Sequence, residues 1–155
     1  MPFRYEDPFS SGSFTQWTGS GRVWIDFNFG VNSLTRGPAA PDLIDVANTD
    51  IETLGFDGIN TTEEVSIVVE LNHNWAEGTA IKPHLHWYPT TTDAGNVNWQ
   101  LEYVLIALGD VVGASTTINV VQAAAGVAWT SQLVAFSDID ATGYLIGTQM
   151  HARLF

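Results

Sequence analysis

VSIVVEL, at residues 65–71, is the clearest strand pattern in this sequence. Its apolar residues Val65, Ile67 and Val69 share one phase with Leu71, and the residues between them fall in the other phase. Side chains of a β-strand alternate between the two faces of a sheet, so this phase predicts a strand with one buried face. The segment indicates a β domain whose core lies on one side of this strand.

Similar segments recur along the chain, and Gly, Pro, Asn and Asp separate them. Leu85 and Trp87 share the inward phase of one segment, and Trp99 and Leu101 share that of the next. Turn residues between period-two segments are typical of antiparallel hairpins. The predicted strands cover residues 22–29, 51–56, 65–71, 81–88, 97–104, 116–121, 133–136 and 144–155.

The fold class follows from the number and length of these segments. Many short strands with almost no helix predict an all-β antiparallel sandwich, and about eight strands of mixed length favour a jelly-roll-like arrangement. A helix is plausible only near Val120–Val127, where three alanines precede Gly126. No repeat of fixed period is visible, which argues against a propeller or solenoid.

The first 21 residues differ from the rest in composition. They are rich in Ser, Gly and aromatic residues without the period of a strand or helix. We interpret residues 1–21 as an extended arm that precedes a single sandwich domain at 22–155. Aromatic rings are costly to leave in water, so we expect the arm to pack on its own domain or on a neighbouring subunit. The interface candidates are Phe3, Tyr5, Phe9, Phe14 and Trp17.

Composition and charge limit the function classes. The chain has 155 residues, 45% of them hydrophobic and only 14% charged, which fits one well-buried domain with a charge-poor surface. With 5 basic and 17 acidic residues, its formal net charge is −12. Such a charge opposes binding to nucleic acid or to an anionic membrane. No apolar run is long enough for a spanning helix, and the start lacks the pattern of a secretory signal, so we expect a soluble protein without Sec export.

Histidine is the strongest candidate for metal chemistry. His84 and His86 alternate with apolar residues on a predicted strand, so both project from one face, as a pair of metal ligands requires. His73 lies close by in sequence. The alternative is that His84 and His86 form a polar outer face while their neighbours enter the core. We favour this structural interpretation and expect no cofactor, although an ion shared between copies of the chain stays open.

The spacing of Gly78, His84 and His86 also resembles the first motif of the cupins. That motif places a glutamate four or five residues after its second histidine, whereas this chain has Thr90 and Thr91 there. The resemblance therefore lacks a ligand that a metal-dependent cupin enzyme would use.

Other catalytic patterns are weak. The chain has no cysteine, which excludes thiolate catalysis and disulfides, and no serine lies in a Gly-X-Ser-X-Gly elbow. The acidic pairs Glu63–Glu64 and Asp138/Asp140 fall at predicted turns, where carboxylates are usually solvated. Acidic residues elsewhere do not form the ladder of an EF-hand. We expect that the protein is not an enzyme.

Aromatic residues offer a last kind of site. Trp75, Trp87, Tyr88 and Trp99 could line a platform on which sugar rings stack. Alternation places Trp87 and Trp99 on the apolar faces of their strands, so for these two we favour the core.

Read as a whole, residues 71–103 carry several short motifs: His73-Asn74-Trp75, Glu77-Gly78-Thr79, Pro83-His84-Leu85-His86-Trp87 and Gly95-Asn96-Val97-Asn98-Trp99-Gln100-Leu101-Glu102-Tyr103. The stretch resembles a segment of structural proteins of tailed bacteriophages, in which H-W-x-E-G-T, P-H-x-H-W and G-N-V-x-W-x-L-E-Y recur. This chain departs from the pattern at Asn74, which separates His73 from Trp75.

The resemblance implies a virion component with a β-sandwich fold, commonly an oligomer. The chain lacks the length of a fibre stalk, which favours a capsid decoration protein. We therefore expect a homotrimer that contacts other virion proteins, such as the major capsid protein, with its N-terminal arm at an interface. The alternatives are a carbohydrate- or receptor-binding module of a tail or fibre and, third, a metal-binding cupin-type enzyme.

Overall fold

The computed structural model describes residues 26–155. The predicted arm, with its five interface candidates, lies outside the described residues. A 3-10 helix at Val31–Ser33 precedes a series of strands. In order these are β1 Thr35–Arg36, β2 Asp42–Asp45, β3 Glu52–Gly55, β4 Val65–Glu70, β5 His84–Trp87, β6 Asn96–Ile106, β7 Thr116–Ala123, β8 Gln132–Ala135 and β9 Gln149–Leu154.

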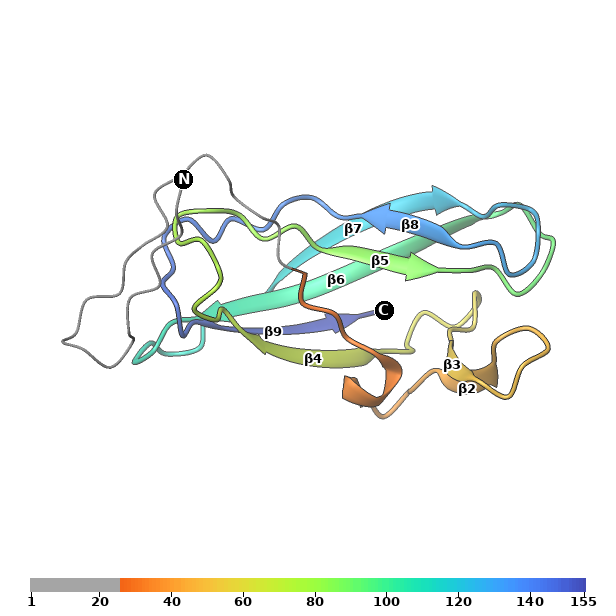
Figure 1. Ribbon diagram of the computed structural model, residues 1–155, viewed down its shortest axis with the longest axis horizontal. Helices are drawn as coiled ribbons and strands as arrows, with labels where there is room; N and C mark the ends of the chain where they lie inside the picture. Colours follow the sequence, from red (N-terminus) through yellow and green to blue (C-terminus); the bar gives the residue numbers. More distant parts are fainter. Residues whose placement is uncertain (1–25) are drawn as a thin grey trace, which may run out of the picture.

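The strands form antiparallel sheets, as predicted. A five-stranded sheet has the order β1-β4-β9-β6-β7, β5 pairs with β8, and β2 with β3 (Figure 1). Strand β4 pairs with β9, β5 with β8 and β6 with β7, all antiparallel. These six strands therefore form one long two-stranded ribbon, and the connection between β6 and β7 is its closed end. The ribbon wraps so that β6 also pairs with β9. A wrapped ribbon of this kind is the jelly-roll arrangement, here with six strands in the ribbon.

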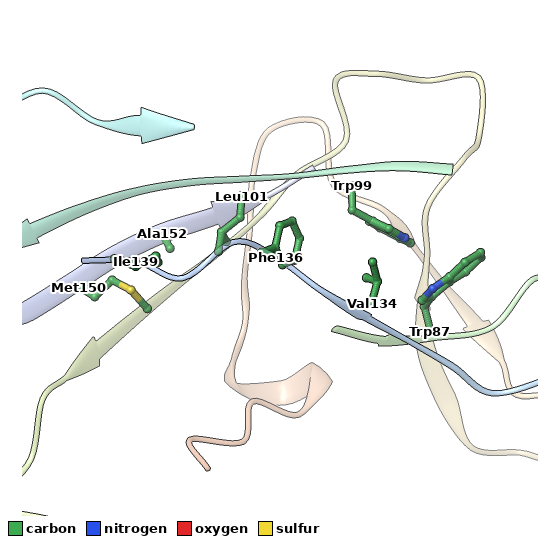
Figure 2. Close-up of a cluster of buried hydrophobic side chains, with 8 residues drawn as sticks. All are labelled: Trp87, Trp99, Leu101, Val134, Phe136, Ile139, Met150 and Ala152. Carbon is green, nitrogen blue, oxygen red and sulfur yellow. The ribbon is translucent and has the colours of Figure 1, made fainter. Parts of the chain in front are cut away.

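The core lies between the five-stranded sheet and the β5–β8 pair. Trp87 and Val134 enter it from the small sheet, and Trp99, Leu101 and Met150 enter from the large sheet (Figure 2). The rings of Trp87 and Trp99 meet edge to face, with centroids 5.7 Å apart. Each large side chain buried here contributes about 1.5–3 kcal/mol relative to exposure. Phe136, Ile139 and Ala152 complete the cluster.

The inward phases predicted for the central strands are confirmed. Val65, Leu71, Trp87, Trp99 and Leu101 are all buried. Three further predicted positions are half-buried and pack against the same cluster: Ile67, Val69 and Leu85.

Two predicted strands are wrong in part within the described residues. Residues 26–29 of the predicted strand 22–29 have no strand conformation, and the chain turns into the 3-10 helix directly after Gly30. The helix that the sequence allowed near Val120–Val127 is absent, because residues up to Ala123 pair with β6. Residues 144–148 form turns, and the last strand begins only at Gln149. Each error has one cause: a local pattern does not show which backbone partner lies alongside.

Side chains join β7 to β8 where the two sheets meet. The Gln132 amide group donates from Nε2 to the carbonyl of Ala123 at 3.0 Å. Its Oε1 accepts from the backbone N–H of Ala125 at 2.9 Å. Because β7 and β8 share no backbone ladder, such bonds hold the small sheet over the large one.

Candidate functional site

The predicted histidines do not gather into one site. His84 and His86 lie side by side on the exposed face of β5, with ring centroids 5.4 Å apart. His73 lies in the turn after β4. Among residues 26–155 no three His, Asp or Glu side chains are grouped closely enough to hold a metal ion. The pair on β5 is thus the only part of the predicted histidine set that the described structure brings together.

The carboxylates at the predicted turns make local bonds. Glu63 accepts from the backbone N–H of Asp57 at 2.6 Å, which closes the turn between them. Asp138 pairs with Lys82 at 3.1 Å. The side chain of Thr142, and then its backbone N–H, hold the pKa of Asp140 below its usual range. These contacts explain the acidic residues as parts of turns and surface ion pairs.

The four candidate aromatics separate into two groups. Trp87 and Trp99 are buried in the core, as favoured. Trp75 is half-buried in a turn, and Tyr88 is exposed beside Trp129, with ring centroids 6.1 Å apart. Trp129 has a φ of 61°, a left-handed conformation that costs free energy for a bulky residue. The Tyr88–Trp129 pair is therefore a partly exposed aromatic surface, with Tyr88 exposed and Trp129 half-buried, and the sequence did not single out Trp129.

Three strongly exposed aliphatic side chains lie close together in the chain at the closed end of the ribbon, between β6 and β7. Leu108 is 98% exposed, Val111 93% and Val112 62%. We call these three residues the apolar tip. Figure 1 shows this connection at one end of the molecule, opposite the β2–β3 hairpin.

The turn itself accounts for that exposure. The N–H of Asp110 donates to the carbonyl of Ala107 at 3.1 Å, which closes a four-residue turn. Gly109 has a φ of 92° within it, a conformation that glycine adopts without strain. Leu108 therefore points away from the sheet. A hollow lined by Tyr103, Gly113 and Tyr144, among others, separates the start of β7 from the loop before β9. Leu145 on that loop is also exposed.

The apolar tip was not among the sites predicted from the sequence. The sequence does contain a pattern that could have predicted it. Aliphatic residues stand in a Gly/Asp turn, where polar residues are usual, in the segment Ala107-Leu108-Gly109-Asp110-Val111-Val112-Gly113. Only the hairpin pairing shows that they project from the end of two long strands.

Negative charge dominates the described surface. Residues 26–155 hold 15 of the 17 acidic residues and 3 of the 5 basic ones, so 3 − 15 gives −12 for this part alone. Arg36 donates to the carbonyl of Pro41 at 2.5 Å, Lys82 pairs with Asp138, and Arg153 pairs with Glu64 and Glu102. All three cations are thus engaged, and most acidic groups keep an uncompensated charge. The described residues include no helix of the length and apolar character needed to cross a membrane.

Comparisons with protein-family models, with curated proteins and with solved structures find no match to this chain.

Proposed function

We propose that this chain is a non-catalytic structural protein of a tailed-phage particle that decorates the head. The observation that carries the proposal is the apolar tip. Three aliphatic side chains in water at the end of a hairpin are unfavourable, and an assembly partner that covers them would gain about 1.5–3 kcal/mol for each fully buried side chain. Such a surface suits a protein whose function is to bind other subunits of a capsid lattice.

The resemblance of residues 71–103 to phage structural proteins supports the same role. Several residues of that segment, Trp87, Trp99 and Leu101 among them, belong to the core between the two sheets. The resemblance thus concerns residues on which the fold depends.

The proposed partners are further copies of this chain, in a homotrimer, and other virion proteins such as the major capsid protein. Residues 1–21 would contribute to these contacts. The proposed location is the virion, assembled in the host cytoplasm. The excess of acidic groups favours partner surfaces with basic residues around an apolar hollow.

Electron microscopy of intact source particles labelled with an antibody against this chain tests the proposal. We expect label distributed over the head. Label confined to the tail would contradict decoration, and particles free of the chain by labelling and by mass spectrometry would contradict a virion role.

A second function, binding of a carbohydrate or receptor by a tail or fibre module, is favoured by the Tyr88–Trp129 pair. A partly exposed aromatic pair with one strained member is a surface on which sugar rings can stack. Glycan binding in solution that Trp129→Ala abolishes would favour this function over decoration.

A further inference from the structure

His84 and His86 lie side by side on the outer face of β5, on a backbone that hydrogen bonds hold in place. The strand pairs with β8 along its whole length, and the carbonyl of Pro83, just before it, accepts from the N–H of Phe136 at 3.0 Å. Both imidazoles are exposed and share one face. Ligands on such an element need little reorganisation to bind an ion.

The separation of the two rings fits a tetrahedral ion. Zinc binds imidazole nitrogen at about 2.0–2.1 Å, and at a tetrahedral angle this places the centres of two coordinating rings about 5 Å apart. The centroids of His84 and His86 are 5.4 Å apart, with ring planes at 77°. Small rotations of the side chains would direct one nitrogen of each ring at a common point.

Residues 26–155 of one chain supply only half of such a site. No third His, Asp or Glu joins the pair within residues 26–155. The neighbours on the same face, opposite in the β5–β8 register, are Leu133 and Ala135, which cannot bind a metal. Structural zinc sites normally have four protein ligands, so two more are needed beyond those that residues 26–155 of one chain bring together, and another molecule can supply them.

We propose that His84 and His86 from two copies of this chain bind one Zn²⁺ through four imidazoles and join the copies at the outer face of β5. A second copy is the partner whose surface matches, because it offers the same pair and the same small apolar neighbours. Leu133, 50% exposed, would pack against the other copy beside the ion.

Charge favours a cation at this contact. Two copies that each carry −12 repel one another, and a divalent ion between them reduces that repulsion. Lys82, near the pair in sequence, is held by Asp138 at 3.1 Å, so its charge is offset.

The test uses the full chain without a polyhistidine tag, first treated with EDTA and then dialysed. Zinc chloride is titrated calorimetrically, and the mass of the species is measured by light scattering before and after. We expect one ion for every two chains and a higher mass with zinc that EDTA reverses. His84→Ala and His86→Ala should each weaken zinc binding by roughly tenfold or more and abolish the gain in mass.

His151→Ala is the matched control, because His151 is also exposed but lies on β9 in the large sheet. It should bind zinc like the unchanged chain. Absence of zinc binding, one ion per chain without a gain in mass, or equal loss in the His151 variant would overturn the proposal. The experiment needs no phage particle, so its failure leaves the proposed decoration role untouched.

Discussion

The indole N–H of Trp87, in β5, donates a hydrogen bond of 2.7 Å to the side-chain carbonyl of Gln122, in β7. The amide group of Gln122 then donates to the backbone carbonyl of Leu133, in β8, at 3.0 Å. One glutamine thus links three strands and both sheets. Gln122 thus provides an acceptor for the indole N–H of Trp87, which is the only polar group in a side chain that is otherwise buried in the core.

Replacing Gln122 with leucine should lower the free energy of unfolding by about 1–3 kcal/mol, because the buried indole N–H of Trp87 loses its acceptor. Urea denaturation measures the change. Gln149→Leu is the control, since the Gln149 side chain is exposed on β9 and forms a hydrogen bond with the exposed His151. An equal decrease in the free energy of unfolding for the two variants would show that the hydrogen bonds of Gln122 between the sheets do not stabilise the fold.

Acid should weaken a second contact, in which the Ser115 hydroxyl and the Arg153 guanidinium hold the pKa of Glu102 below its usual range. A carboxyl with a depressed folded pKa adds stability that is present above its unfolded pKa and is lost as pH falls through the folded pKa. Glu102→Gln should therefore be less stable at pH 7, by about 0.2–1 kcal/mol for a surface pair.

This difference in the free energy of unfolding should begin to shrink as pH falls below about 4.3, the ordinary pKa of a glutamate, and should vanish only below the lowered folded pKa, where the carboxyl is neutral like the amide. Unfolding curves between pH 7 and pH 3 measure it. Glu70→Gln, at an exposed position of β4 in the same sheet, should show little change at any pH. If the difference in the free energy of unfolding between Glu102→Gln and the unchanged chain stays constant over the whole pH range, the stabilising role given to the Glu102 carboxylate is contradicted.

Deletion of residues 1–21 tests the proposed role of the aromatic arm. We expect weaker self-association and weaker binding to particles, because each aromatic ring buried at a contact contributes roughly 25 cal/mol per Å² of apolar area. The far-UV circular dichroism should stay that of a folded β protein. A full chain that sediments as a monomer, together with a truncated chain that binds particles normally, would defeat this prediction.

Sequence alone predicted the parts of the fold that depend on local alternation. The inward positions of Val65, Trp87 and Trp99 follow from a period of two, and so does the outward position of His84 and His86. Period-two segments with turn residues between them were enough to identify an antiparallel β protein.

The remaining features depend on partners far apart in the sequence. Strands β4 and β9 pair across some eighty residues, and no local pattern shows that Gln122 meets Trp87. Phe27 and Phe29 belong to a strand-like sequence pattern but have no partner strand in the described structure. The histidine pair was predictable from spacing, whereas the 5.4 Å between its rings required coordinates.

Binding of the purified chain to particles stripped of it tests the central claim, that the protein works through its apolar tip. We predict that Leu108→Ser weakens binding by roughly tenfold or more, the equivalent of about 1.4 kcal/mol or more. Ile59→Ser should bind normally, because Ile59 is 92% exposed but lies in the loop between β3 and β4, away from the tip. Normal binding by Leu108→Ser, with both variants folded, would contradict the account.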